Sequence, residues 1–166
     1  MEKPLFEETQ RSVVIIIVSV MVVIIVGLLA VSKIASDKPS YSMVIAFFIT
    51  AVTCILLGSQ KLKTTITPDE IIYSFGIFSS RSVIKIGDVQ SMSITKYDPL
   101  TDFLGWGLRN NSTTDCYTVS GDTGLELILP DRKRKIWIGT SKSTELQLVL
   151  QAHFPDKLPS ANENRS

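Results

Sequence analysis

Residues 12–32 read SVVIIIVSVMVVIIVGLLAVS, and residues 39–60 read PSYSMVIAFFITAVTCILLGSQ; neither stretch contains a charged side chain. A helix needs about 20 apolar residues to cross the roughly 30 Å hydrocarbon core of a bilayer. The valines and isoleucines of the first stretch favour a strand in water, but a single segment in lipid pairs all its backbone groups only as a helix. Both stretches are therefore predicted to be transmembrane helices, which together form a hairpin anchor over residues 12–60.

Two other interpretations of these stretches fit less well. Two buried, entirely apolar helices are uncommon in a soluble chain of 166 residues, because such helices need a large protein around them. A cleaved signal peptide usually has an apolar region of about 7–15 residues. The first stretch is longer, although Ala30-Val31-Ser32 would serve as a cleavage site. The lengths favour the hairpin anchor.

Basic residues around the two spans predict their orientation. Two precede the first span, two follow the second, and two lie in the connecting loop; in that order they are Lys3, Arg11, Lys61, Lys63, Lys33 and Lys38. The side with more basic residues usually faces the cytoplasm. Both termini are thus expected in the cytoplasm, with the chain in the inner or plasma membrane. Residues 1–11 then form a short cytoplasmic segment, and the two cysteines stay reduced and apart.

The sequence pattern changes after the second span. Residues 61–154 contain short β-branched and apolar runs separated by turn residues, which predicts an antiparallel sandwich or barrel. The last part, residues 143–154, places four apolar residues at helical spacing: Leu146, Val149, Leu150 and Phe154. This helix is predicted to cap the β-structure, and the polar residues 155–166 are predicted to be disordered. The expected class is a membrane-anchored α+β protein.

The composition and the motifs argue against nucleic-acid binding and against an enzyme. The chain has 17 Lys and Arg against 16 Asp and Glu, so its net charge of +1 does not favour nucleic acid. The single histidine, His153, forms neither a triad nor a metal site by itself. Asp122-Thr123-Gly124 spells an aspartic-protease triplet, but it fits a hairpin turn. Gly105-Trp106-Gly107 lacks the third glycine of a dinucleotide site. A non-enzymatic protein without metal or cofactor is expected.

Basic residues also gather around the last predicted hairpin turn and after the second span. They are Arg132, Lys133, Arg134 and Lys135 at the turn, and Lys61 and Lys63 at the bilayer exit. Near an anionic leaflet, each such charge contributes about 1 kcal/mol of attraction. These six residues are candidate contacts for lipid headgroups; the alternative is a hairpin tip charged for solubility.

Residues 96–109, KYDPLTDFLGWGLR, combine aromatic, acidic and glycine residues. If residues 105–109 are extended, Trp106 and Leu108 share one face, while the two glycines and Arg109 share the other. Trp106 and Leu108 are then expected to fill the core. Tyr97 or Phe103 is expected to cover the glycines, with Arg109 reaching Asp98 or Asp102. These residues form either a structural corner or a recognition site for a peptide or small ligand.

Three stretches resemble the bacterial pleckstrin-homology-like (PH-like) membrane proteins: KYDP followed by GWGLR, CYTVSGDTGLELIL, and RKIWIGTSKSTEL. The opening PLFEETQR is similar to the N-terminal motif of a subgroup with two leading spans. The resemblance implies a strongly bent antiparallel sheet closed at one end by the C-terminal helix. It implies no defined activity. The acidic turn at residues 67–70 argues against phosphoinositide binding, because its carboxylates repel phosphate.

The expected function follows from the anchor and the absence of catalytic residues. The domain is predicted to recognise or scaffold a membrane protein or peptide at the cytoplasmic face, with strand addition to a sheet edge as a possible mode. The alternative is a sensor of anionic lipid headgroups that acts through residues 132–135. A membrane enzyme is the third hypothesis.

Overall fold

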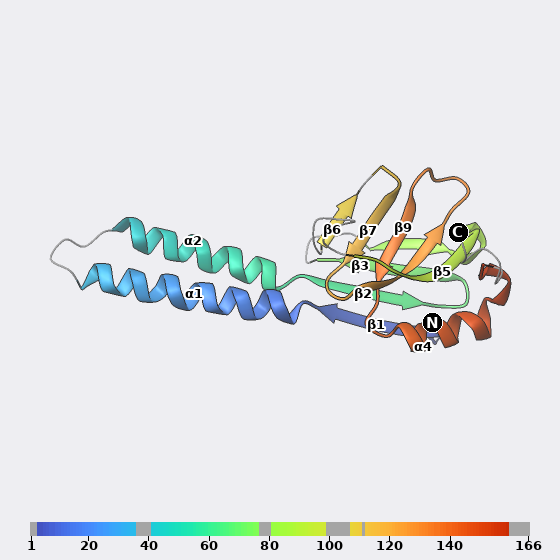
Figure 1. Ribbon diagram of the computed structural model, residues 1–166, viewed down its shortest axis with the longest axis horizontal. Coiled ribbons are helices and arrows are strands. Elements are labelled where there is room, and N and C mark those ends of the chain that lie inside the picture. The colour runs from blue at the N-terminus through green and yellow to red at the C-terminus, as the bar shows by residue number, and fades with distance from the viewer. Residues whose placement is uncertain (1–2, 36–40, 77–80, 99–106, 111, 160–166) are drawn as a thin grey trace. The chain divides into compact units, whose positions relative to one another are not determined.

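A computed structural model describes residues 3–35, 41–76, 81–98, 107–110 and 112–159. The chain forms two compact units (Figure 1). One unit contains residues 11–60. The other combines Met1–Gln10 with Lys61–Ser166, so its first strand is separated from the rest of its sequence by the whole helical unit.

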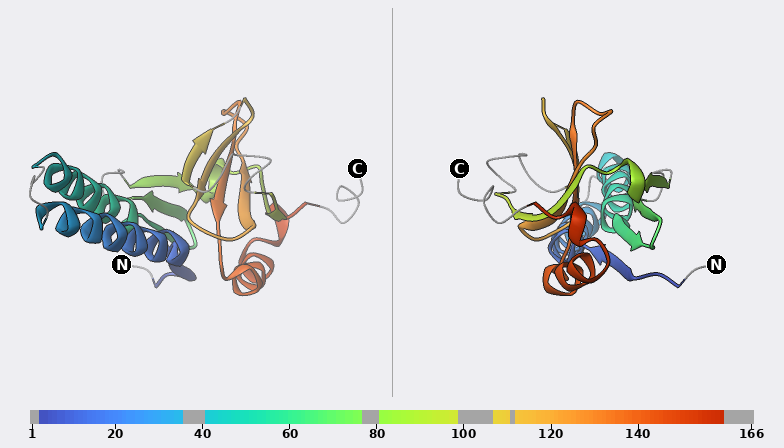
Figure 2. Two further views of the ribbon diagram at one scale, coloured as in Figure 1. Left: turned by 60° about the vertical axis from the view of Figure 1, so that its left-hand side comes forward. Right: turned by 90° about the vertical axis from the view of Figure 1, so that its right-hand side faces the viewer.

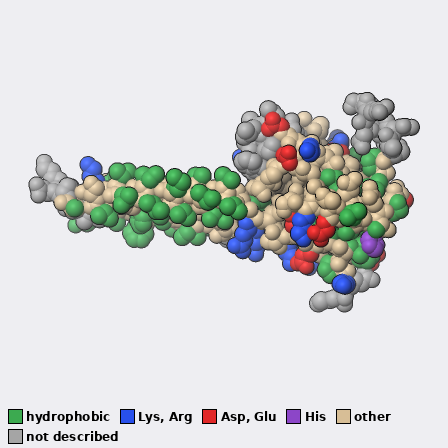
Figure 3. Space-filling view, turned by 60° about the horizontal axis from the view of Figure 1, so that its bottom comes forward, with side chains coloured by type: hydrophobic (Ala, Val, Ile, Leu, Met, Phe, Trp, Pro, Cys, Tyr) green, Lys and Arg blue, Asp and Glu red, His purple; other side chains and the backbone are tan. Residues whose placement is uncertain are grey.

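The helical unit confirms the two long apolar helices, which are α1 (Val13–Ile34) and α2 (Tyr41–Gly58). The side chain of Ser12 accepts a hydrogen bond from the N–H of Ile15 and caps the start of α1. Both helices are long and apolar enough to cross a membrane. Their valines, isoleucines and leucines lie exposed around the hairpin (Figure 3). So much exposed apolar surface is unfavourable in water.

The first sheet of the other unit has the strand order β1-β2-β3-β4. Its strands are β1 (Phe6–Arg11), β2 (Lys61–Ile66), β3 (Glu70–Phe75) and β4 (Ser82–Lys85). The arrows of β1 and β2 point in opposite directions (Figure 1), and the N–H of Leu5 donates to the carbonyl of Ile66 at 2.8 Å. The sequence predicted a separate N-terminal segment at residues 1–11, but residues 6–11 form a strand of this sheet. β1 carries no clear strand pattern in the sequence, because two of its inward residues, Glu8 and Gln10, are polar.

The second sheet is mixed and has the order β5-β8-β9-β7-β6. Its strands are β5 (Ser91–Lys96), β6 (Gly107–Asn110), β7 (Thr114–Thr118), β8 (Thr123–Ile128) and β9 (Lys135–Gly139). β7 and β9 run parallel, which corrects the prediction of purely antiparallel structure.

The position of β9 also corrects the hairpin predicted at residues 121–124. β9 lies between β8 and β7, so these two strands are not hydrogen-bonded neighbours. Ile136, Trp137 and Ile138 are consecutive and all buried, so β9 is covered on both faces. A strand that is apolar on both faces is most stable in the middle of a sheet. The predicted turn after β8 is confirmed, since β8 and β9 pair antiparallel.

The core lies between the two sheets and α4 (Ser143–His153), which confirms the predicted C-terminal helix. α4 lies at one end of the second sheet (Figure 2) and buries Leu146 and Leu150 completely. Two short 3₁₀ turns follow the strand β4 and the helix α4: η1 (Ile86–Asp88) and η2 (Pro155–Lys157).

The prediction that residues 155–166 are disordered is wrong for residues 155–159. The ammonium of Lys157 donates to the carbonyl of Val89 at 2.9 Å, and Leu158 packs against the core. These contacts hold residues 155–159 against the domain. The sequence pattern does not indicate these contacts, because the segment has few apolar residues. Residues 160–166 lie outside the described part of the chain.

Candidate functional site

The predicted corner at residues 96–109 is described only in part. Asp102, Phe103 and Trp106 lie outside the described residues, so their proposed roles stay predictions. Tyr97 is buried at the end of β5, Asp98 follows it, and Arg109 is exposed on β6. Leu108, which was expected to face the core, is 57% exposed. β6 is the last strand of its sheet, and no described strand pairs with its outer side.

Tyr97 packs against Trp137, which the sequence analysis did not single out. Their ring centroids are 4.1 Å apart with an interplanar angle of 71°. Cys116, which stands opposite Trp137 on the parallel pair of strands, completes this small buried cluster. A Cβ at Gly124 would lie 2.9 Å from the indole nitrogen of Trp137. Trp137 therefore lies over Gly124, whereas the predicted cover of Gly105 by Tyr97 or Phe103 involves residues outside the described part of the chain.

The cluster holds its titratable groups neutral. Burial raises the pKa of Tyr97 to about 12, although a hydrogen bond with Thr118 lowers it in part. Burial likewise raises the pKa of Cys116 to about 11. A thiol needs a lowered pKa to be a good nucleophile near neutral pH, so this cluster suits packing. Among the described residues, no group of three or more His, Cys, Asp or Glu side chains is placed to hold a metal ion.

The basic tip, which we define as Arg132, Lys133, Arg134 and Lys135, is partly neutralised by neighbouring carboxylates. Arg134 lies 3.2 Å from Asp115, and Lys135 lies 3.1 Å from Glu126. Arg132 and Lys133 are exposed, and neither shows an ion pair within the described part of the chain. Two ion pairs halve the free positive charge available to an anionic surface.

The two basic residues after the second helix differ from each other. Lys61 is exposed at the start of β2. Lys63 lies two residues further on the same face of the strand, where its ammonium is 2.7 Å from the carboxylate of Glu7. Both side chains of this pair are about half exposed, so the pair contributes little to stability.

A cleft of about 220 Å³ separates β5 from α4. Its walls come from both elements and from the chain after η2; they include Ser93, Ile94, Gln147, Leu150, Gln151 and Leu158. Leu150 forms an apolar floor, and the two glutamines supply amide groups. The cleft is smaller than the roughly 300–1,000 Å³ typical of sites for drug-sized ligands. Its volume suits one large side chain.

The main chain of β5 borders this cleft as a sheet edge. Among the residues that the structure describes, β5 is the first strand of its sheet and pairs with β8 alone. The N–H of Tyr97 donates to Asp122 at 2.8 Å, and hydrogen-bonded pairs alternate along an antiparallel ladder. The main-chain groups of Met92, Ile94 and Lys96 therefore point away from β8. They form a row of donors and acceptors that another strand can pair with.

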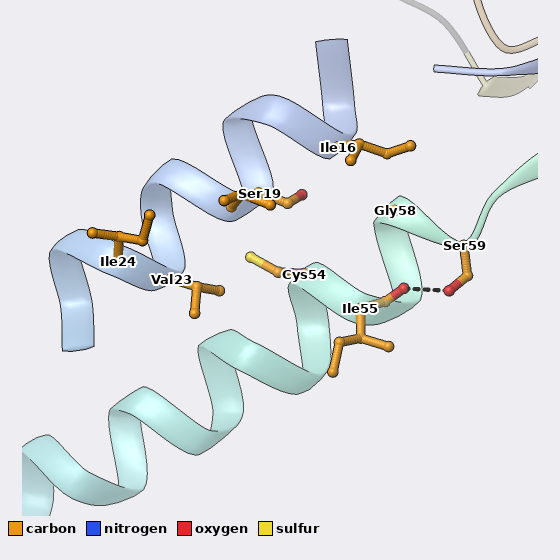
Figure 4. Close-up of a pocket in the computed structure, with 9 residues that line it drawn as sticks. Ile16, Ser19, Val23, Ile24, Cys54, Ile55, Gly58 and Ser59 are labelled. Atoms are coloured by element: carbon orange, nitrogen blue, oxygen red, sulfur yellow. Dashed lines mark hydrogen bonds between the residues drawn. The ribbon is translucent and has the colours of Figure 1, made fainter. Parts of the chain in front are cut away.

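A second hollow lies in the helical unit (Figure 4). It has a volume of about 380 Å³, and its walls are mainly apolar. The residues labelled are Ile16, Ser19, Val23, Ile24, Cys54, Ile55, Gly58 and Ser59, and Val20 also lines the hollow. The hydroxyl of Ser59 donates to the carbonyl of Ile55 within its own helix. That hydroxyl is thus already satisfied, and the open groove has the apolar character of a lipid-facing surface.

No family model, curated protein or solved structure matches this chain. Its function therefore has to be argued from the surfaces described above. At the β5–α4 cleft, a sheet edge that is unpaired among the described residues lies beside a side-chain pocket.

Proposed function

We propose that this protein is a non-catalytic, membrane-anchored PH-like module that binds an extended segment of a partner membrane protein. The observation that carries the proposal is the edge of β5 beside the cleft against α4, which no described strand pairs with. A bound strand takes its affinity from main-chain hydrogen bonds and its specificity from pockets for alternate side chains. One side chain of the partner fills the cleft over Leu150.

The anchor in this proposal is the hairpin of α1 and α2, with both termini and the domain in the cytoplasm. Its support is the exposed apolar surface of both helices and the excess of basic residues at the chain ends. The PH-like assignment is supported by the two sheets and the C-terminal helix. The parallel pairing of β7 and β9 departs from the antiparallel sheet that the resemblance implies.

Site-specific photo-crosslinking in intact cells tests the binding surface. Gln151→p-benzoylphenylalanine places a photoreactive group on the wall of the cleft. Leu148→p-benzoylphenylalanine is a matched control, because Leu148 is 63% exposed on the same helix but does not line the cleft. We expect a discrete adduct with another membrane protein from position 151 and a much weaker one from position 148.

A second substitution links the adduct to strand addition. Lys96→Pro removes one outward-pointing N–H of β5 and is compatible with an edge strand. One lost hydrogen bond corresponds to about a tenfold weaker interaction, so the adduct from position 151 should fall accordingly while the melting temperature stays unchanged. Equal adducts from positions 148 and 151, or an adduct indifferent to Lys96→Pro, would refute strand addition at β5.

A further inference from the structure

The outer face of the first sheet carries a row of polar side chains that crosses three strands. Lys63 of β2 stands directly opposite Ser74 of β3. Tyr73 stands opposite Ser82, so the same register brings Arg81 opposite Ser74. Side chains in such a row lie about 5 Å apart. With Thr65 and Ile72, these three residues line a pocket of about 260 Å³.

The pocket is rich in hydrogen-bond donors. Lys63 has three N–H groups and contacts the carboxylate of Glu7. Arg81 is exposed and shows no ion pair among the described residues, so its guanidinium presents up to five donors. The hydroxyl of Ser74 lies between the two cations. This arrangement matches the oxygen atoms of a phosphate group, which accept charge-assisted hydrogen bonds from both sides.

The surroundings of the row add positive charge and apolar surface. Lys61 precedes Lys63 on the same face of β2. Val83, which stands opposite Ile72, is 48% exposed. Cations around an apolar patch suit the interface of a bilayer, where phosphates lie above acyl chains.

The length of chain between α2 and Lys63 limits how far they can be apart. Lys63 follows Gly58 by five residues, and five extended residues span at most about 18 Å. The headgroup layers add roughly 5–8 Å on each side of the hydrocarbon core. If α2 crosses the bilayer, this length of chain allows the row to contact the headgroups beside the end of α2.

We propose that Lys63, Ser74 and Arg81 bind the phosphate of an anionic phospholipid in the membrane that holds the helices. This inference rests on the anchoring part of the proposed function and is independent of the β5–α4 cleft, which belongs to the other sheet. The site selects lipids of net negative charge, since a zwitterionic headgroup carries its own cation close to the phosphate. We assign the main lipid contact to this row and not to the basic tip, because its two cations and a hydroxyl line the same pocket.

Native mass spectrometry of the full-length protein in detergent tests the site, with phosphatidylglycerol and phosphatidylcholine as the probes. We expect the wild type to retain phosphatidylglycerol in preference to phosphatidylcholine. Lys63→Gln combined with Arg81→Gln should weaken this retention about 30-fold, which corresponds to the loss of two charges near an anionic surface. Arg132→Gln combined with Lys133→Gln is the matched control and should leave retention unchanged.

Glu7→Gln separates lipid binding from a structural role of Lys63. It breaks the same ion pair as Lys63→Gln but leaves the cation in place. Retention of phosphatidylglycerol should then stay the same or rise. A loss comparable to that of Lys63→Gln would overturn the proposal, and so would equal losses in the two double variants.

A competition arm distinguishes lipid from free phosphate. Inorganic phosphate is added at the same concentration as phosphatidylglycerol. If it displaces the lipid from the wild type, and this displacement is lost in the Lys63→Gln and Arg81→Gln variant, the site binds a soluble anion. That result would overturn the lipid assignment. Failure of the membrane-anchor proposal gives a different result, because the full-length chain would then be recovered from cells in soluble form without detergent. Failure of strand addition would abolish the crosslink at position 151 and leave lipid retention intact.

Discussion

Glu8 provides a strong test of how the first strand is held. It lies on β1, is 5% exposed, and its two carboxylate oxygens contact the segment between β9 and α4. One oxygen accepts from the hydroxyl of Thr140 at 2.6 Å. The other accepts from the N–H of Ser141 at 2.9 Å and from the hydroxyl of Ser141. Residues more than 130 positions apart in sequence are thus joined by one carboxylate.

The magnitude follows from these contacts. A hydrogen bond to a charged group contributes about 1.5–3 kcal/mol, so Glu8→Ala removes about 3–6 kcal/mol if two bonds are lost without replacement. Ser141 is exposed, and water can replace part of its contact. We therefore expect a loss near the lower end, about 3 kcal/mol, which is large against a total stability of about 5–15 kcal/mol.

The assay is urea denaturation of the full-length protein in detergent, followed by near-ultraviolet circular dichroism of the domain aromatics. Glu7→Ala is the control, because the neighbouring carboxylate is half exposed and its ion pair with Lys63 should contribute about 0–1 kcal/mol. Thr140→Val is measured alone and combined with Glu8→Ala. The double variant should lose less stability than the sum of the losses of the two single variants, because both remove the same hydrogen bond. If Glu8→Ala and Glu7→Ala differ by less than about 0.5 kcal/mol, the carboxylate does not hold β1 as described.

Three further predictions concern the domain. The pKa of Tyr97 is raised from 10.0 to about 12, so the folded state favours the protonated phenol. The free energy of unfolding should therefore be constant below about pH 9 and fall as the pH rises toward 12. This fall should be smaller in the Tyr97→Phe variant. Gly124→Ala should cost about 1–3 kcal/mol because its Cβ would press on Trp137, whereas Gly87→Ala, with no atom within 4 Å, should leave the melting temperature nearly unchanged. Deleting residues 1–11 should lower the melting temperature of the domain, because the deletion removes β1 and leaves β2 as an open sheet edge. Calorimetry of the truncated chain measures this change, and an unchanged transition would mean that β1 is dispensable.

The two helices, the C-terminal helix and most strand positions could be predicted because their signals are local. A charge-free run of suitable length identifies each of α1 and α2, and an apolar face ended by Pro155 identifies α4. The turn between β8 and β9 is marked by its own proline and charged residues. Such signals lie close in sequence to the residues whose structure they predict.

The candidate sites depended on contacts that the sequence pattern does not contain. Neither of the two surfaces proposed as binding sites was identified as a whole from the sequence. Lys63 was singled out, but Ser74 and Arg81 join it only through the pairing of three strands. Similarly, Ser93 and Gln151 face one cleft although they lie 58 positions apart in the printed numbering.

The sequence by itself determined which segments are helical and apolar, because hydrophobic length and periodicity act over neighbouring residues. Only the tertiary structure decided that β1 joins the sheet across the helical unit, that β9 inserts between β8 and β7, and that Trp137 covers Gly124. The physical reason is that strand partners are selected by side-chain packing and hydrogen bonds between distant segments. Gln10 shows this directly, since its amide donates to the carbonyl of Gly139, 129 residues away in the chain.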